Sequence, residues 1–254
     1  MSPEPPRQYL AFHKLAERYP FEATCYQVER FAQLLASLAE SGFKLFNGDE
    51  PNRGEVVITF DDGYAHLAEL LPPLLETYQF TPLIFMPTLW IDQSNSWDFS
   101  HRLKPVQHLL ADQITELANL GVQFGGHGHS HTNFKQLTDR ELSAELARSR
   151  EILHDLTDQS IDTVSYPFGR YDSRVLDAVN QAGYHSGFSL AFPKESDLPL
   201  ATGRFAVYSW DSPQAVLRKL RQGRGYWIEK AKARLVNLAS GGTIILQRLR
   251  SRRS

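Results

Sequence analysis

The sequence predicts an α/β fold: a distorted (β/α) barrel of seven to eight parallel strands in a single domain. Short apolar segments alternate with longer amphipathic ones along most of its 254 residues, which is the pattern of a parallel sheet with helical crossovers. Hydrophobic residues make up 42% of the chain, enough to form one large core. At this length a closed or nearly closed barrel is the expected solution, and a doubly wound open sheet is the alternative.

Eight segments have the composition of strands, because they are rich in Val, Ile, Phe and Tyr and are bounded by Gly, Pro or Asp. They cover residues 9–12, 55–60, 81–87, 122–126, 162–168, 185–191, 204–209 and 242–247. Five segments between them repeat apolar residues at intervals of three and four, the period of an amphipathic helix. These are residues 28–41, 64–78, 111–120, 139–156 and 173–182. Thr138 with Glu141 predicts a capping box, and Gly183 predicts a helix end.

Charge and cysteine content limit the classes of partner. The net charge of −2 argues against nucleic acid as the main partner. Cys25 is the only cysteine, so neither an internal disulfide nor a cysteine-based zinc site is expected. The sequence has no transmembrane segment of 18 apolar residues and no recognisable signal segment at its N-terminus, which predicts a cytoplasmic location.

Two adjacent carboxylates end a predicted strand in "VVITFDDGY". Asp61 and Asp62 are neighbours, and neighbouring residues at a strand end point in different directions. One carboxylate can therefore hold a metal while the other reaches a substrate, and a cation would keep both ionised. The alternative is an ordinary Asp-Asp-Gly turn.

Three histidines follow another predicted strand in "GGHGHSH". His127 and His131 are four residues apart, and with a strand-end aspartate they offer two imidazole nitrogens and one carboxylate. Such a set leaves a fourth position open for water, as in catalytic zinc sites. The glycines at 125, 126 and 128 predict a tight turn after the strand rather than a helix. His129 is expected to be a spacer outside the ligand set.

A third segment, "SYPFGRYD", places a sharp turn just after a strand. Pro167 and Gly169 fix this turn, and backbone N–H groups in such turns can face a developing oxyanion. The alternative is an ordinary strand-to-helix turn capped by Asp172 or Ser173.

In this order and at these separations, the three segments resemble the polysaccharide deacetylase family, also known as the NodB homology domain or carbohydrate esterase family 4. "TFDDGY" matches its first motif, "HGHSH" its second with Gly in the Ser/Thr place, and "YPFG" a common form of its third. The resemblance covers about residues 9–210. It implies a NodB-like barrel, with residues 1–8 as an N-terminal tail, 9–247 as the catalytic domain and 248–254 as a basic tail.

The resemblance also implies a mechanism. Asp62, His127 and His131 would bind a divalent metal ion, usually zinc, and Asp61 would be the general base. The reaction would be hydrolysis of the acetamido group of N-acetylglucosamine residues in an acetylated glycan. The backbone N–H of Phe168, next to Pro167, would help to hold the oxyanion. Other acyl or amide substrates, or a catalytically impaired glycan-binding relative, remain alternatives.

Two positions depart from the family pattern. Ser165 stands where the third motif often has an Arg that braces the base. If the strand-like run 242–247 is the equivalent of the family's last strand, Gln247 stands where the last motif has a His that protonates the leaving amine. The alternative is that this run is only a C-terminal strand or tail and the last motif is absent. A glutamine cannot act as a general acid. His13, His185 and His129 are the candidate acids, and His13 is favoured because it follows the first strand.

Further residues are expected to contact the substrate or to orient the site. Arg204 is expected to face the pocket and pair with an acid, with an edge salt bridge as the alternative. Tyr64, which follows the Asp-Asp-Gly turn, is a candidate substrate contact. Trp97 and Asp98 lie in the long irregular segment 88–107 and are candidates for stacking on a sugar and hydrogen bonding to it, unless the tryptophans of this loop are only buried anchors.

Overall fold

The computed structural model of the protein describes residues 7–17, 22–94, 106–194 and 197–222. The predicted strand 242–247, with Gln247, lies outside the described residues, as do Trp97, Asp98 and the basic tail 248–254.

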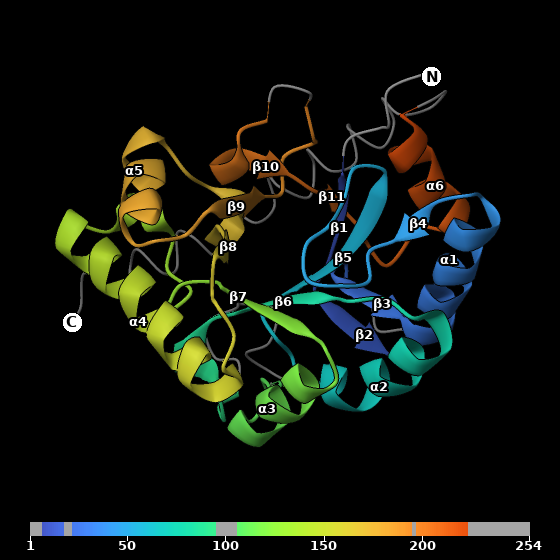
Figure 1. Cartoon of the computed structure of the whole chain (residues 1–254), viewed down its shortest axis with the longest axis horizontal. Coiled ribbons are helices and arrows are strands. Elements are labelled where there is room, and N and C mark those ends of the chain that lie inside the picture. Colours follow the sequence, from blue (N-terminus) through green and yellow to red (C-terminus); the bar gives the residue numbers. More distant parts are fainter. Residues whose placement is uncertain (1–6, 18–21, 95–105, 195–196, 223–254) are drawn as a thin grey trace.

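The centre of the fold is a nearly closed barrel of eight parallel strands (Figure 1), as predicted. Along the barrel the strands follow the order β10, β9, β8, β7, β6, β5, β1, β11. Their bounds are β1 Gln8–Phe12, β5 Glu55–Asp61, β6 Leu83–Met86, β7 Gln123–Gly126, β8 Thr163–Ser165, β9 Ser186–Ser189, β10 Thr202–Gly203 and β11 Phe205–Ala206. β4 (Lys44–Leu45) pairs with β5, and β2 (Lys14–Ala16) pairs with β3 (Cys25–Gln27) in a separate small sheet.

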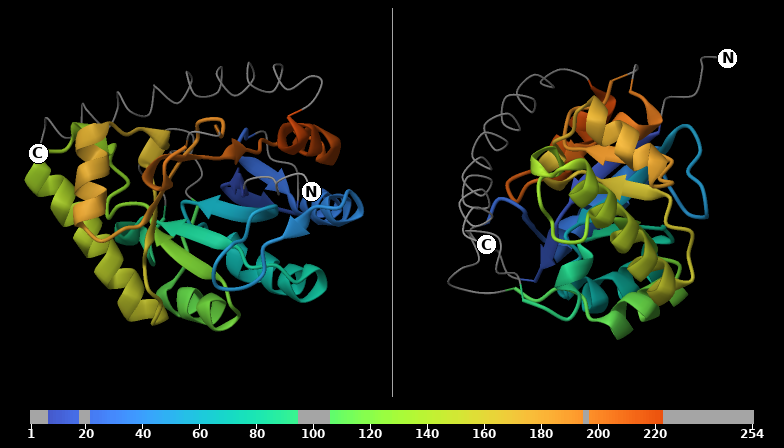
Figure 2. Two further views of the ribbon diagram at one scale, coloured as in Figure 1. Left: turned by 45° about the horizontal axis from the view of Figure 1, so that its top comes forward. Right: turned by 90° about the vertical axis from the view of Figure 1, so that its left-hand side faces the viewer.

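Helices surround the barrel (Figures 1 and 2). They are α1 Val28–Glu40, α2 His66–Tyr78, α3 Ala111–Asn119, α4 Asp139–Thr157, α5 Ser173–Gln181 and α6 Pro213–Arg221. The capping box of Thr138 and Glu141 is present at the start of α4, and Gly183 follows α5 with a φ of +84°. In the described part of the chain, α6 is the one α-helix that the sequence pattern did not predict. Its signals were Ser212 as N-cap and Pro213 at the first helical position.

The alternation of side chains along β5 explains where the catalytic candidates lie. Val56, Ile58 and Phe60 pack outward in the main core between sheet and helices. Val57 belongs instead to a second cluster made by the inward faces of several strands: Tyr9, Phe46, Val57, Leu83, Phe85 and Phe188. Because successive side chains point to opposite faces of a sheet, Asp61 also points into the barrel, at the carboxyl end of its strand.

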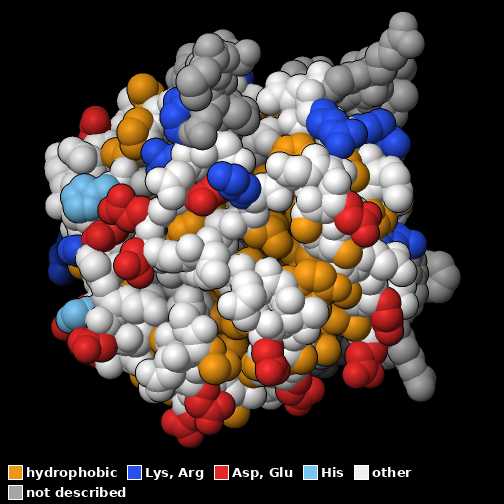
Figure 3. All heavy atoms as spheres, turned by 45° about the vertical axis from the view of Figure 1, so that its right-hand side comes forward, with side chains coloured by type: hydrophobic (Ala, Val, Ile, Leu, Met, Phe, Trp, Pro, Cys, Tyr) orange, Lys and Arg blue, Asp and Glu red, His pale blue; other side chains and the backbone are white. Residues whose placement is uncertain are grey.

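The surface of the protein has charged side chains of both signs. On the face shown in Figure 3, Lys and Arg side chains and Asp and Glu side chains both occur around a partly apolar area. A membrane span would need about 20 apolar residues in one helix, and the helices in the described ranges include none that is both long and apolar enough.

Candidate metal centre and active site

The Asp-Asp-Gly segment forms a strained turn at the end of β5. Asp62 has a φ of +71°, a left-handed conformation that costs a non-glycine residue free energy. The segment 107–109 holds this turn from the side. The Nδ1–H of His108 donates to the backbone oxygen of Asp62 at 2.7 Å, and the amide of Leu109 donates to Gly63 at 2.9 Å. The carboxylate of Asp62 is thereby fixed at the mouth of the barrel.

The histidine loop follows β7 as an irregular turn, as its glycines predicted. His131 is also left-handed, with a φ of +61°. The carboxylate of Glu145, on α4, accepts hydrogen bonds from the amides of His129 and Ser130 at 2.7 and 2.8 Å. Gly128 must be small, since a Cβ there would lie 2.8 Å from a ring carbon of Phe134 and 3.1 Å from a carboxylate oxygen of Glu145.

Asp62, His127 and His131 bring three ligand atoms together. His131 Nε2 lies 3.2 Å from His127 Nε2 and 3.2 Å from Asp62 Oδ1, and His127 Nε2 lies 3.5 Å from the same oxygen. All three side chains are buried. A zinc ion bound at 2.0–2.1 Å in tetrahedral geometry separates its ligand atoms by about 3.3 Å. The triangle of atoms therefore matches one face of a tetrahedral site.

Two further observations fit a metal ion at this triangle. The Nδ1 of His127 lies 2.7 Å from the backbone oxygen of Ser165. A carbonyl only accepts, so Nδ1 carries the proton and Nε2 presents its lone pair to the centre of the triangle. Asp62 Oδ1 is buried and accepts no hydrogen bond within the described part of the chain, as expected of an atom that a cation would satisfy.

His129 is not part of this triangle. Its Nδ1 lies 2.8 Å from the hydroxyl of Thr88, and burial lowers its pKa. Its side chain therefore lies on the side of the loop that faces η1 (Thr88–Trp90), which agrees with its expected role as a spacer.

The electrostatics of the triangle favour a cation. Burial alone would raise the pKa of Asp62, but close contacts with His127 and His131 outweigh burial and hold this pKa well below its usual value. Burial also opposes protonation of His127, yet Asp62 and Asp61 together raise the His127 pKa. Burial dominates at His131 and lowers its pKa. A cation bound at the triangle would compensate the charge of the buried Asp62 carboxylate.

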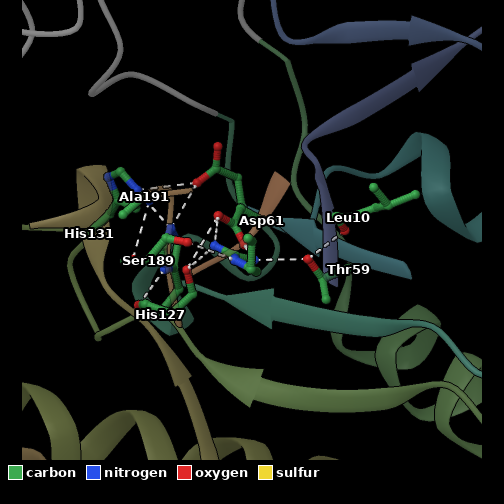
Figure 4. Close-up of polar contacts among 10 residues, drawn as sticks. Leu10, Thr59, Asp61, His127, His131, Ser189 and Ala191 are labelled. Atoms are coloured by element: carbon green, nitrogen blue, oxygen red, sulfur yellow. Dashed lines mark hydrogen bonds and ion pairs between the residues drawn. The ribbon is translucent and has the colours of Figure 1, made fainter. Parts of the chain in front are cut away.

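Arg204 binds the carboxylate of Asp61 with both of its terminal nitrogens. Figure 4 labels Asp61 and Thr59 within this set of polar contacts. Nη1 lies 2.7 Å from Oδ1 and Nη2 lies 2.7 Å from Oδ2. The same nitrogens reach Thr59 Oγ1 at 2.9 Å and Ser165 Oγ at 2.8 Å. Burial would raise the pKa of Asp61, but Arg204 and then His127 outweigh it and lower this pKa. Asp61 is therefore an ionised, oriented base candidate beside the triangle.

The "YPFG" turn lies against the histidine loop. η4 (Pro167–Gly169) contains Phe168 with a left-handed φ of +61°, and its ring packs on the His131 ring with centroids 4.9 Å apart. Pro167 is buried beneath it. Asp172 caps α5 by accepting from the amide of Val175. The turn therefore leads into a helix that Asp172 caps, as the alternative interpretation predicted, and it also lies next to the ligand triangle.

The structure separates the three candidate acids. His13 follows β1 at the barrel mouth, is half-buried, and its charge helps to lower the pKa values of both Asp61 and Asp62. The side chain of His185 is 77% exposed and precedes the start of β9, at the opposite end of the barrel. His129 faces away from the triangle. Of these three, His13 is the one whose charge lowers the pKa of both aspartates.

Tyr64 has little surface for a substrate. It is buried, stacks on His108 at 5.0 Å between ring centroids, and carries the Lys14 ammonium 4.8 Å from its ring centre. This placement favours a packing role behind the Asp-Asp-Gly turn.

Motif reasoning did not find the residues that hold the two loops. His108 and Glu145 lie in segments without any catalytic pattern, 46 and 15 residues in sequence from the groups that they bind. In the sequence they are single polar residues outside any motif. Many other polar residues of the chain look the same, so the sequence alone does not distinguish these two.

The site and the fold define a class of protein. A family described as polysaccharide deacetylase matches residues 48–187, and the chain belongs to this family. A Bacillus subtilis (strain 168) protein described as "Putative polysaccharide deacetylase YxkH" is 30% identical over 148 residues, 58% of this chain and 49% of that protein. The chain thus spans about half the length of this curated relative.

Solved structures show the same fold. The Streptococcus pyogenes deacetylase PplD, in complex with acetate, superposes with a TM-score of 0.72 at 18% identity, covering 85% of this chain and 99% of that one. The de-N-acetylase from Aggregatibacter actinomycetemcomitans gives a TM-score of 0.69 at 15% identity, covering 84% and 99%.

Proposed function

We propose that this protein is a metal-dependent hydrolase that removes N-acetyl groups from N-acetylglucosamine residues of a poly- or oligosaccharide, within a catalytic domain of residues 9–247. One observation carries the proposal. The ligand triangle of Asp62, His127 and His131 lies directly beside an ionised Asp61 that Arg204 holds in place. Membership of the polysaccharide deacetylase family supports the substrate class.

The donor set suits zinc. Two imidazole nitrogens and one carboxylate, leaving one position open, are typical of catalytic zinc sites. When bound, such an ion polarises the acetyl carbonyl and lowers the pKa of the attacking water. The protein's contribution is the orientation of the ligands, through the Ser165 carbonyl on His127 and the Glu145 carboxylate on the loop.

Asp61 would accept the proton of the attacking water. Its lowered pKa keeps it ionised at neutral pH. Arg204 donates to both carboxylate oxygens and Ser165 donates to Oδ2 as well, so Oδ1 keeps a second lone pair for the water. The fixed orientation reduces the entropy that the proton transfer would otherwise cost.

Phe168 and His13 would complete the reaction. The left-handed turn at Phe168 lies against His131, so its backbone N–H can stabilise the oxyanion of the tetrahedral intermediate. His13 would then protonate the leaving amine, since it follows β1 at the barrel mouth and is the one candidate acid whose charge acts on both aspartates. In this proposal His13 takes the role that the family pattern gives to the histidine of its last motif.

Acetate release from N-acetylglucosamine oligomers tests the proposal. We expect release by the zinc-loaded protein, loss after removal of the metal by a chelator, and recovery when zinc is restored. Asp61→Asn should abolish turnover without loss of metal. His13→Gln should lower kcat with little change in KM, because the residue acts on the leaving group. Full activity after complete metal removal would contradict the mechanism. Activity on other acetylated substrates but not on these oligomers would redirect the substrate assignment.

A further inference from the structure

An exposed tryptophan stands at the tip of a tightly anchored turn just after β11. Trp210 is 45% exposed. The turn spans residues 208–211. It is closed by a hydrogen bond from the backbone amide of Asp211 to the backbone carbonyl oxygen of Tyr208, at 2.8 Å. The Asp211 carboxylate closes it again by accepting from the Tyr208 amide at 2.9 Å. Trp210 is thus presented by a backbone with little freedom.

Buried contacts fix this turn to several parts of the fold. Asp211 and Lys219 form an ion pair at 2.6 Å with exposures of 1% and 2%, and Lys219 also donates to the Ala206 oxygen at 2.7 Å. The hydroxyl of Tyr26 donates to the backbone carbonyl oxygen of Asp211 at 2.9 Å. The guanidinium of Arg30, on α1, donates to the backbone carbonyl oxygen of Ser209 at 2.7 Å. These contacts tie the turn to β3, α1, β11 and α6.

The indole itself is supported from below. Its ring stacks on the ring of Tyr208, with centroids 5.2 Å apart and planes at 22°. The ammonium of Lys219 lies 5.5 Å from the centre of the Tyr208 ring. Tyr208 is almost fully buried, so Trp210 is the outer member of a packed column. A ligand that stacks on it would not have to immobilise a mobile side chain.

Strand register places this column at the mouth of the catalytic barrel. Arg204 points inward to reach Asp61, and Ala206, two residues further on in β11, lies on the same face. Tyr208 packs in one cluster with Ala206. The pairs Ala11 with Ala206 and Phe12 with Phe60 bring Tyr208 to the level of His13 and Asp61. Tyr208 lies two strands from Asp61, which is about 10 Å. Trp210 follows two residues after Tyr208 and is exposed at the same end of the barrel.

We propose that Trp210 is a stacking platform for a pyranose ring of the glycan, next to the residue that is deacetylated. The C–H groups on one face of a hexopyranose form an apolar surface, and burial of this surface on an indole stabilises binding. The inference rests on the proposed function for the identity of the reaction. It adds a requirement for a substrate of at least two sugar units.

Trp210→Ala, compared with Trp210→Phe, tests the platform. The probes are N-acetylglucosamine and its linear pentamer, with the zinc-loaded protein. We expect Trp210→Ala to raise KM for the pentamer about tenfold, which is 1.4 kcal/mol, with kcat within about twofold. Trp210→Phe should give a smaller rise, and the KM for the monomer should not change. Leu120→Ala is the matched control, because Leu120 is also exposed but precedes β7 at the opposite end of the barrel.

Two results would overturn the platform. One is an unchanged KM for the pentamer in Trp210→Ala. The other is an equal rise of KM for monomer and pentamer, which would indicate a general distortion. If the wild-type protein released no acetate at all, calorimetric titration with the pentamer would separate the two proposals. Weaker binding by Trp210→Ala than by the wild type would support the platform alone, and equal binding or none would overturn it.

Discussion

The guanidinium of Arg204 and the hydroxyl of Ser165 lie 2.8 Å apart, and both contact the same oxygen of Asp61. Ser165 stands where the family pattern often has an arginine that braces the base. Here the guanidinium comes from a different part of the chain and fills that space. A serine at 165 leaves room for it and adds a hydrogen bond, at 3.3 Å, to Asp61. An arginine therefore still holds the base Asp61 in position, but this arginine comes from position 204 instead of position 165.

Replacement of Arg204 should affect both activity and acid stability. In Arg204→Met the burial of Asp61 is no longer opposed by the guanidinium, so its pKa rises. Stability from an ionised Asp61 is present above the unfolded pKa of about 3.9 and is lost as the pH falls. In the variant this loss, and the acid limb of kcat/KM, should move to higher pH. The loss of a buried partner should also lower the free energy of unfolding by about 3–5 kcal/mol.

Arg174→Met is the matched control for this prediction, because Arg174 forms an ion pair with the exposed Asp139 at 2.8 Å. Surface pairs contribute at most about 1 kcal/mol, so its pH profile should match the wild type. Identical acid limbs in Arg204→Met and the wild type would contradict the role of Arg204 in holding Asp61 ionised.

Metal binding should stabilise the folded protein through Asp62, His127 and His131. At a free zinc concentration one hundred times Kd, the free energy of unfolding should rise by about 2.7 kcal/mol, which a thermal melt detects as a higher Tm. The gain should shrink as the pH falls, because the raised pKa of His127 makes protons compete with zinc. His131→Ala should abolish the zinc-dependent shift in Tm, and His129→Ala should keep it. The reverse pattern would show that the ligand register is wrong.

Glu145 should control how well the histidine loop is preformed. Glu145→Ala removes the acceptor of the His129 and Ser130 amides, and we expect about a tenfold weaker zinc affinity, similar to the loss of other groups that orient metal ligands. Glu145→Gln keeps an acceptor oxygen and should recover part of the affinity. Competition with a chromophoric chelator measures both. Glu151→Ala, on the exposed side of the same helix, should not change the affinity, and an equal loss there would point to α4 as a whole.

Cys25 should be unreactive in the native protein. Burial raises the pKa of its thiol to about 11, although Lys14 lies nearby. Since the thiolate is the reactive form, alkylation at pH 8 should be slow when the protein is folded and rapid in denaturant. Fast modification without unfolding would show that the region around β3 opens readily.

The parts of the site that lie in single short segments were predictable. The ends of β5 and β7 and the turn after β8 carry their chemistry in adjacent residues, so "TFDDGY", "HGHSH" and "YPFG" could be read directly. Strand composition also located most of the barrel strands. These patterns depend on local spacing, which the sequence contains.

Long-range pairing was less predictable. Arg204 and Asp61 are 143 residues apart, and only the closure of the barrel brings them together. The segment 204–209 was expected to be one strand, whereas the structure has a two-residue β10 before Arg204 and a two-residue β11 after it. Lys219 lies among several basic residues, a composition typical of a solvated helix face, yet it is buried against Asp211. Partners distant in sequence decide each of these cases.

The order of the strands gives Arg204 a second consequence. β10 and β11 lie at opposite ends of the strand order, and Arg204 is the single residue between them. The seam of the barrel therefore closes at the residue that orients the base. Any separation of β10 from β11 would displace the guanidinium from Asp61, so opening of the seam and loss of catalytic alignment would occur together. Amide hydrogen exchange at the seam should then rise under the same conditions that switch the active site off.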